Sequence, residues 1–147
     1  MIEFKNVSKV YDNGSVALDD VCLTINDGEF ILVCGHSGAG KSTLFKLLTH
    51  EVVPDTGTVI VDDFDVTRMK RSKIPKLRRK LGVVFQDFRL LPNKTVAENI
   101  AFALEVIEEK PKIIKEKVSH VLELVGLSEK ANDLPEDLSG GEQQRVA

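Results

Sequence analysis

One glycine-rich stretch constrains the fold of this chain more than any other feature. Residues 35–43 have the sequence Gly-His-Ser-Gly-Ala-Gly-Lys-Ser-Thr, which matches the G-x-x-x-x-G-K-[ST] pattern of a phosphate-binding loop, or P-loop. The apolar residues 30–34 before it predict a buried strand, and residues 44–48 after it, Leu-Phe-Lys-Leu-Leu, predict a helix. The pattern therefore predicts a loop held between a strand and a helix.

The residue types of this loop suit a polyphosphate group. Its glycines let backbone N–H groups approach phosphates, and the helix that begins near Lys41 adds its own N–H groups and the positive end of its dipole. Lys41 is expected to reach the β- and γ-phosphates, Ser42 to ligate Mg²⁺ and Thr43 to donate near the α-phosphate. The predicted nucleotide-binding residues of the loop are Gly35, His36, Ser37, Gly38, Ala39, Gly40, Lys41, Ser42 and Thr43.

This loop motif leaves alternatives open. A glycine-rich turn that binds nothing is the structural alternative, and the motif by itself does not separate an ATPase from a GTPase or a kinase. A GTPase is disfavoured because residues 93–96, Asn-Lys-Thr-Val, lack the aspartate of a guanine-specific N-K-x-D motif.

Composition limits the class of protein. The 147 residues suffice for one domain, and 42% hydrophobic with 29% charged residues is typical of a soluble globular chain. The net charge of −3 gives no global argument for nucleic-acid binding. No apolar run approaches the roughly 20 residues that cross a bilayer, and the N-terminus lacks a signal-peptide pattern. Cys22 and Cys34 lie in apolar runs, so we expect buried, reduced thiols of a cytosolic protein.

The remaining pattern predicts strands followed by helices. Apolar residues predict strands at residues 1–10, 16–25, 58–61 and 81–85, and helices at residues 96–107 and 111–125. Thr95 and Glu98 have the spacing of a capping box at the start of the first helix, and Gly126 suits the end of the second. Tyr11 ends the first strand, either as a half-buried aromatic or as a platform on which adenine stacks.

Positive charge is concentrated in one segment. Residues 68–80 hold eight basic residues and no acidic ones, whereas the remainder of the chain holds 12 basic and 23 acidic residues. We interpret this segment first as the solvated face of a short helix. The alternatives are contact with anionic lipid head groups or an acidic partner surface. Nucleic acid comes last, because no aromatic side chains are interleaved.

Two further features lie in the second half of the chain. Gln86 directly follows the predicted strand at residues 81–85, where a ligand for a metal or water could lie beside a phosphate loop. Residues 138–145, Leu-Ser-Gly-Gly-Glu-Gln-Gln-Arg, place Ser139 and Glu142 at capping-box spacing, so a helix should begin there. Together with Gly140 and Gly141, this start could bind a second anion or could be an ordinary capped helix start.

Taken in this order, the P-loop, Gln86 and residues 138–145 resemble the nucleotide-binding domain of ATP-binding-cassette (ABC) proteins. Residues 138–145 are similar to the signature motif of that family, which is far more specific than a P-loop. The resemblance implies that Tyr11 stacks on adenine and that Gln86 is the glutamine of the Q-loop. It also implies a head-to-tail homodimer in which the signature closes over the γ-phosphate held by the partner. The residues assigned to this contact are Ser139, Gly140, Gly141 and Glu142.

A narrower resemblance covers essentially the whole chain. Residues 74–91, 93–96 and 101–106 are very similar to segments of the FtsE family of cell-division ATPases, a branch of the ABC proteins. This resemblance implies a cytoplasmic ATPase held at the inner face of the cell membrane by an integral membrane partner of the FtsX family. ATP-driven motion would then control peptidoglycan hydrolases at the septum, and residues 86–91 would contribute to the surface that binds the partner.

The chain departs from the family pattern in one respect. Ala147 follows the signature, so the Walker B aspartate, the catalytic glutamate and the switch histidine of the family have no counterpart here, and His36, His50 and His120 lie elsewhere. We therefore expect an N-terminal fragment without a catalytic base, which binds nucleotide without efficient turnover. We also expect exposed apolar surface and an open sheet edge, because a strand beside residues 30–34 is missing.

Together these features predict an α/β P-loop NTPase fold of the ABC type, with a mixed sheet, antiparallel N-terminal strands and a helical subdomain. The expected parts are residues 1–85 (P-loop core and antiparallel strands), 86–138 (Q-loop and helical subdomain) and 139–147 (start of the signature helix). ATP and Mg²⁺ are the expected cofactors, with Ser42 and Gln86 as metal ligands. The alternatives are a subunit of another ABC transporter, either an importer or a lipoprotein exporter, and a non-catalytic fragment that docks on a partner.

Overall fold

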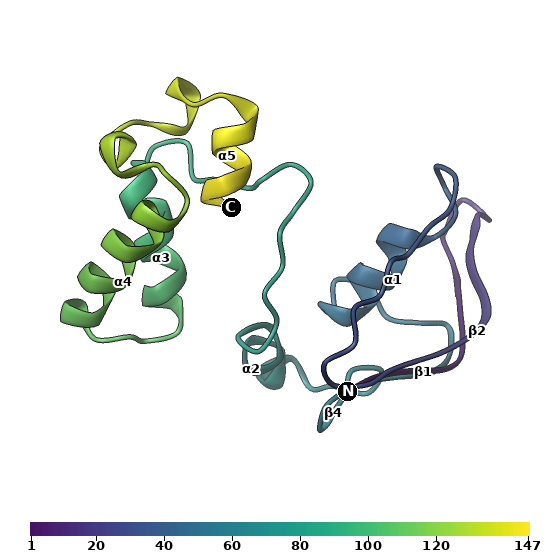
Figure 1. Cartoon of the computed structure of the whole chain (residues 1–147). Coiled ribbons are helices and arrows are strands. Elements are labelled where there is room, and N and C mark those ends of the chain that lie inside the picture. The colour runs from purple at the N-terminus through teal and green to yellow at the C-terminus, as the bar shows by residue number, and fades with distance from the viewer. The chain divides into compact units, whose positions relative to one another are not determined.

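The computed structural model describes all 147 residues, and the chain folds as two compact units, Met1–Gly82 and Val83–Ala147 (Figure 1). None of its helices combines the length and the apolar character that crossing a bilayer requires.

The first unit is built on a four-stranded sheet in which every pair of strands is antiparallel, so the expectation of a mixed sheet is wrong. Its strands are β1 (Ile2–Val10), β2 (Val16–Ile25), β3 (Thr56–Val61) and β4 (Phe64–Asp65), in the order β2-β1-β3-β4. The hairpin between β1 and β2 closes through a bond from the Tyr11 N–H to the Ser15 carbonyl at 2.9 Å. The predicted N-terminal pair of strands and the turn between them are therefore confirmed.

Helices cover this sheet through a few large apolar side chains. Helix α1 (Lys41–Leu48) contributes Leu47, and the short helix α2 (Ile74–Arg78) contributes Leu77 after a 3₁₀ helix, η1 (Arg71–Lys73). Burial of each leucine stabilises the fold by roughly 1.5–3 kcal/mol. The buried core of the unit consists of Phe4, Val7, Leu18, Leu47, Val59, Val61, Val66 and Leu77.

The second unit is helical. It contains α3 (Val96–Val106), α4 (Pro111–Leu124) and α5 (Gly140–Val146), with the 3₁₀ helices η2 (Ser128–Lys130) and η3 (Pro135–Asp137) between α4 and α5. The predicted capping box at Thr95 and Glu98 is present, and Gly126 has a φ of 68° just after α4. The core of this unit consists of Val96, Val118, Leu122, Leu127 and Leu138.

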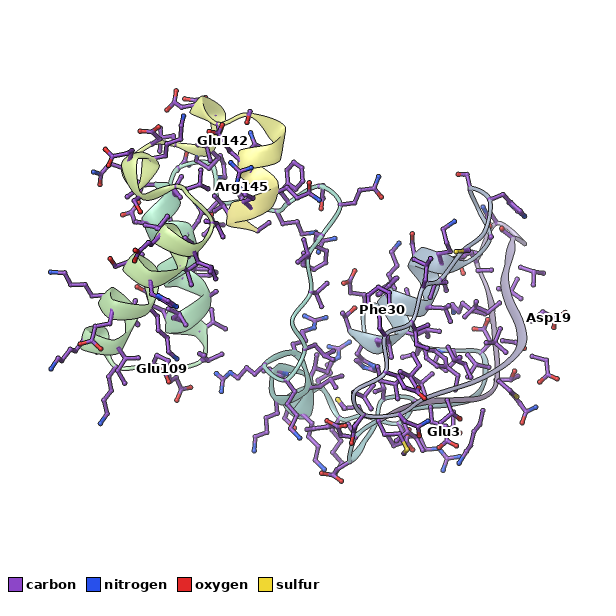
Figure 2. The ribbon with its side chains drawn as sticks, in the orientation of Figure 1. Glu3, Asp19, Phe30, Glu109, Glu142 and Arg145 are labelled. Carbon is purple, nitrogen blue, oxygen red and sulfur yellow. The ribbon has the colours of Figure 1, made fainter.

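Two predicted strands are wrong. Residues 30–34 and 81–85 form no strand, and no other segment of the chain supplies a hydrogen-bonded neighbour for either of them. Phe30 is 91% exposed and Leu32 is 76% exposed, so the expected exposed apolar surface is present; Figure 2 marks Phe30 on this segment. An apolar sequence favours an extended chain, but ladder bonds to a neighbouring strand are what make it a strand.

The predicted burial of the two cysteines is also wrong. Both thiols are free, as predicted, but both are exposed. Cys22 lies on β2 between the half-buried Val21 and Leu23, so the alternation of a strand turns it outward. Cys34 lies in the unpaired segment before the P-loop, where nothing covers it.

Candidate functional site

The P-loop and the end of the first hairpin line one hollow in the first unit. The hollow has a volume of about 300 Å³. It therefore brings the predicted Tyr11 together with the second half of the predicted loop, while Gly35, His36 and Ser37 form the stretch leading into it. The residues that line it are Tyr11, Ser15, Ala17, Gly38, Ala39, Gly40, Lys41, Ser42, Thr43 and Lys46.

Gly40 is the residue on which the loop closes. It is buried, it has a φ of 82°, and it is the N-cap of α1. A Cβ atom at this position would lie 2.1 Å from the carbonyl oxygen of Ala17 and 3.0 Å from Cδ2 of Leu18. Because β2 packs directly against the loop at Gly40, both the backbone angle and the available space require glycine.

Helix α1 begins without a side-chain cap. No side chain accepts a bond from a backbone N–H group of its first turn, and that turn contains no acidic residue. The N–H groups of Lys41 and Ser42 have no acceptor within the helix, because the first turn of any α-helix lacks one. These donors, the helix dipole and the exposed Ser42 hydroxyl together make a site for an anion at the hollow.

The Lys41 ammonium group is held by the loop itself. Its Nζ atom donates to the carbonyl oxygens of Gly35 at 2.7 Å and His36 at 2.8 Å. The loop is braced further by a bond from the Ala39 N–H to the His36 carbonyl at 3.2 Å. The ammonium group that is predicted to bind the phosphates is therefore positioned by backbone carbonyls of the same loop.

Tyr11 joins the hairpin to the helix. Its hydroxyl lies 3.2 Å from Oγ1 of Thr43, within hydrogen-bonding distance, and Thr43 is only 5% exposed. The half-buried environment proposed for Tyr11 is seen, whereas its stacking on adenine stays a prediction. Sequence reasoning missed Lys46, which lies on α1, and Ser15 and Ala17, which line the same hollow because the turn after Tyr11 brings β2 back toward the loop.

The residues present fit a nucleotide with its metal. A polyphosphate would find two lysines, Lys41 and Lys46, and uncapped N–H groups in the hollow, and no carboxylate lines it. Mg²⁺ bound to such phosphates usually takes only one or two protein ligands and keeps several waters. The exposed Ser42 hydroxyl on the first turn of α1 is placed to be one of them.

Gln86, the second predicted metal ligand, belongs to the second unit. It is exposed in a turn that a bond from the Phe88 N–H to the Phe85 carbonyl closes at 3.1 Å. The guanidinium group of Arg89 lies over the Phe85 ring, 3.8 Å from its centroid, which stiffens the turn. Contact of Gln86 with a metal stays a prediction.

The predicted signature segment begins α5 with a complete capping box. Glu142 Oε2 accepts bonds from the Ser139 N–H at 2.8 Å and the Ser139 hydroxyl at 2.6 Å. These bonds hold the pKa of the Glu142 carboxyl below its usual value, and Lys130 and Arg145 add weaker attraction. The predicted helix start is confirmed, and Ser139 and Glu142 are hydrogen-bonded to each other within the segment.

The glycines of this segment differ from Gly40. A Cβ atom on Gly140 or Gly141 would meet nothing within 4 Å, and neither residue has a positive φ. Their own surroundings therefore do not require glycine. A bare backbone at an exposed helix start permits close approach by another molecule.

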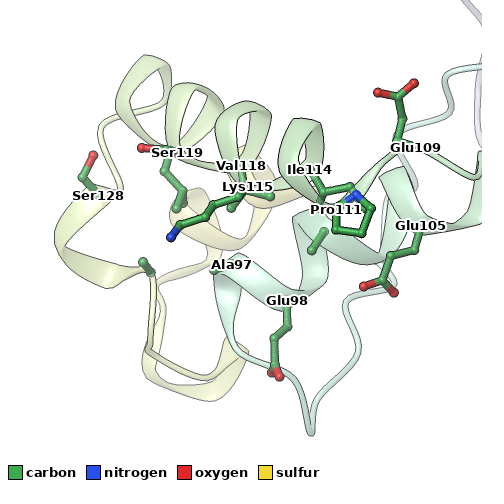
Figure 3. A pocket seen from close by; sticks show the side chains of 13 residues that line it. Ala97, Glu98, Glu105, Glu109, Pro111, Ile114, Lys115, Val118, Ser119 and Ser128 are labelled. Atoms are coloured by element: carbon green, nitrogen blue, oxygen red, sulfur yellow. The ribbon is translucent and has the colours of Figure 1, made fainter.

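A larger hollow in the second unit does not suit a nucleotide. This groove lies between α3 and α4 and has a volume of about 760 Å³ (Figure 3). Ile114, Val118 and Leu122 give it an apolar lining. The carboxylates of Glu98, Glu105 and Glu109 also line it and would repel a polyphosphate. The hollow at the P-loop is therefore the candidate site, although it is the smaller of the two.

Comparison with known proteins shows the family of the chain. The model of the ABC transporter family matches residues 18–147. The cell division ATP-binding protein FtsE of Bacillus subtilis (strain 168) is 54% identical over 147 residues, which cover 100% of this chain and 64% of that protein. FtsE of Mycobacterium tuberculosis is 51% identical over 148 residues with the same two coverages. The chain thus spans 64% of the length of these relatives.

Other similar proteins are the ATP-binding protein of an importer and an ATP-binding cassette of known structure. The methionine import ATP-binding protein MetN 1 of Bacillus thuringiensis is 45% identical over 149 residues, which cover 99% of this chain and 44% of that protein. A dimeric ATP-binding cassette in a post-hydrolysis state, bound to ADP and Pi, matches with a TM-score of 0.89 at 35% identity. That match covers 99% of this chain and 66% of the solved one. The ABC-type α/β fold is confirmed, and the chain belongs to the ABC transporter family.

Proposed function

We propose that this chain binds MgATP in the hollow at the P-loop and forms the nucleotide-binding part of an ABC ATPase. The observation that carries the proposal is the uncapped start of α1, where Gly40 closes the loop and Lys41 and Ser42 begin the helix. The family match and the ADP and Pi in a similar cassette support it.

Each residue of the hollow has a distinct role in this proposal. Lys41 and the N–H groups of the first turn neutralise the β- and γ-phosphates, Ser42 and Gln86 place Mg²⁺, and Tyr11 stacks on adenine. In hydrolysis by an ABC ATPase, water would attack the γ-phosphate in line, and catalysis would come from positioning and charge neutralisation. Neither a carboxylate nor a histidine lines the hollow, so we assign its residues to binding and metal placement.

Dimerisation completes the proposed site. A similar cassette is dimeric, which supports a homodimer in which the signature of one chain meets the nucleotide of the other. Ser139, Gly140, Gly141 and Glu142 would form this contact. The open space at both glycines leaves the backbone accessible to the γ-phosphate.

The biological role that we propose is that of the FtsE relatives. Identities of 51–54% over the whole chain support an ATP-binding subunit of a cell-division complex. It would work with an FtsX-type integral membrane protein at the inner face of the cell membrane and control peptidoglycan hydrolysis at the septum. The exposed turn at Gln86 and the residues up to Leu91 would contribute to the contact with this partner.

Titration calorimetry with MgATP tests the binding site. We expect Lys41→Ala to bind ten- to 100-fold more weakly, because a charge-assisted hydrogen bond contributes about 1.5–3 kcal/mol. Lys112→Ala, which removes an exposed lysine from α4, is the matched control and should bind like the unchanged chain. Equal binding by both variants would exclude the P-loop as the nucleotide site.

A second candidate role is that of an importer subunit. The 45% identity to MetN 1 supports it. Co-purification with an FtsX-type protein and with a methionine permease from the same cells separates the two roles. Retention of the permease alone would replace the cell-division role and leave the nucleotide site unaffected.

A further inference from the structure

The strongest charged feature outside the nucleotide site is the basic segment, residues 68–80. All of its cationic side chains are exposed. The positive charge is local, because the remainder of the chain has 12 basic and 23 acidic residues. The cations are Arg68, Lys70, Arg71, Lys73, Lys76, Arg78, Arg79 and Lys80.

The segment is fixed to the first unit by its apolar residues. Leu77 is fully buried, and Met69 and Leu81 pack against the same core. Arg78 adds a bond from its Nε atom to the carbonyl oxygen of Thr49 at 2.9 Å, which ties α2 to the end of α1. The basic side chains are therefore displayed from an anchored element and not from a free chain.

Most of these charges are not neutralised by the protein. Lys80 lies 3.9 Å from Asp62 and over the Phe64 ring, but Asp62 also accepts a bond from the N-terminal amino group at 2.8 Å. No salt bridge involves the other cations that precede Arg78. The side chains without an ion pair are Arg68, Lys70, Arg71, Lys73 and Lys76.

The segment offers charge without an apolar anchor. None of the large exposed hydrophobic residues of the chain lies between residues 68 and 80. A protein interface normally needs buried aromatic or apolar anchors, and a single-stranded nucleic acid needs aromatic rings on which bases stack. Anionic lipid head groups need only a cluster of exposed lysines and arginines.

We propose that the basic segment binds the anionic head groups of a phospholipid bilayer. Membership of a transporter family gives a reason for such contact, because a chain of this family works close to a membrane. The inference goes beyond nucleotide binding and does not depend on it. Each basic residue near an anionic surface raises partitioning about five-fold, so three charges together account for roughly 100-fold.

Vesicle co-sedimentation of this chain tests the proposal. We expect binding to vesicles that contain phosphatidylglycerol and little binding to vesicles of phosphatidylcholine alone. Raising the salt from about 0.02 to about 0.15 M should weaken the binding, because the Debye length falls to about 8 Å. The triple variant K70Q/K73Q/K76Q should lose roughly 100-fold in partitioning, and the control K110Q/K112Q/K115Q removes the same charge from the second unit and should lose little.

Three outcomes would overturn the proposal. They are equal loss in the two triple variants, equal binding to both kinds of vesicle, and tighter binding to duplex DNA than to anionic vesicles at the same salt. The comparison of the two kinds of vesicle uses the unchanged chain, so it tests the lipid proposal even if a variant folds poorly. Lys41→Ala separates this inference from the proposed function, because it should bind vesicles normally while losing MgATP.

Discussion

Helices α1 and α5 begin in opposite ways. The N-cap of α1 is Gly40, which has no side chain, and the first turn holds a lysine and no acidic residue. The N-cap of α5 is Ser139, which forms a reciprocal capping box with Glu142. At the first start no side chain accepts a bond from a backbone N–H group, whereas at the second the Ser139 hydroxyl accepts a bond from the Glu142 N–H and Glu142 accepts one from the Ser139 N–H.

This difference indicates that a helix start open to an anion and one stabilised by its own side chains need different residues. A carboxylate in the first turn stabilises a helix. It also occupies the N–H groups that a phosphate would use, and its negative charge repels the phosphate. In this chain α1 has no carboxylate in its first turn and therefore lacks that stabilisation. For α5 to contact a phosphate, as we propose, Ser139 would have to share its bonds with Glu142 or release them.

Substitution of Gly40 and of Gly141 gives the largest expected difference in stability between the two helix starts. Gly40→Ala should destabilise the first unit by at least about 1–2 kcal/mol, from the left-handed backbone alone, and should abolish MgATP binding because the Ala17 carbonyl excludes the new methyl group. Gly141→Ala should leave stability unchanged or raise it by up to about 1 kcal/mol, since alanine favours a helix. Urea unfolding measures both.

A similar loss of stability in the two glycine variants would show that the start of α5 is as constrained as that of α1. The comparison between the helices would then fail.

Removing serines from the two helix starts should separate stability from binding. Ser139→Ala should cost about 1 kcal/mol of stability by removing a cap, and Thr95→Ala, at the capping box of α3, should cost about the same. Ser42→Ala should change stability by less than about 0.5 kcal/mol and weaken ATP binding only when Mg²⁺ is present. Thermal unfolding and calorimetry with and without Mg²⁺ provide the measurements.

If Ser42→Ala is instead the more destabilising change, then Ser42 caps or packs in solution. Its assignment as a metal ligand would lose its structural support.

The smallest expected effect is on pH dependence. Hydrogen bonds from Ser139 lower the pKa of Glu142 in the folded chain, so the carboxylate stabilises α5 above its ordinary pKa of 4.5. This contribution is lost as the pH falls below 4.5 toward the lowered value. Stability measured from pH 7 to pH 3 should therefore fall less steeply in Glu142→Gln than in the unchanged chain.

The uncapped α1 has no such carboxylate, so Lys41→Gln should leave the slope between pH 7 and pH 3 as it is. An unchanged slope in Glu142→Gln would show that the capping box contributes nothing through its charge.

Local signals in the sequence predicted the helix starts well. The capping boxes at Thr95 and Ser139 and the glycine after α4 were identified from spacing, because their physics acts within about four residues. The P-loop and Lys41 were identified in the same way.

Features that depend on distant partners were not predictable from local patterns. Residues 30–34 have the composition of a strand but lack a neighbour to pair with. The bond between Tyr11 and Thr43 joins residues 32 positions apart, and Ser15 and Ala17 reach the hollow only because the hairpin folds back. The meeting of Gln86 and the signature with a nucleotide stays a prediction for the same reason, since it depends on groups outside each segment.

The position of Tyr11 gives the molecule an optical property. It is the only tyrosine, and the chain has no tryptophan, so its near-ultraviolet emission comes mainly from a ring in the lining of the proposed nucleotide site. A purine that stacks on this ring should quench the emission, whereas inorganic triphosphate should change it little. On the proposed stacking, Tyr11 is an intrinsic fluorescent reporter that would follow nucleotide binding in real time without a label.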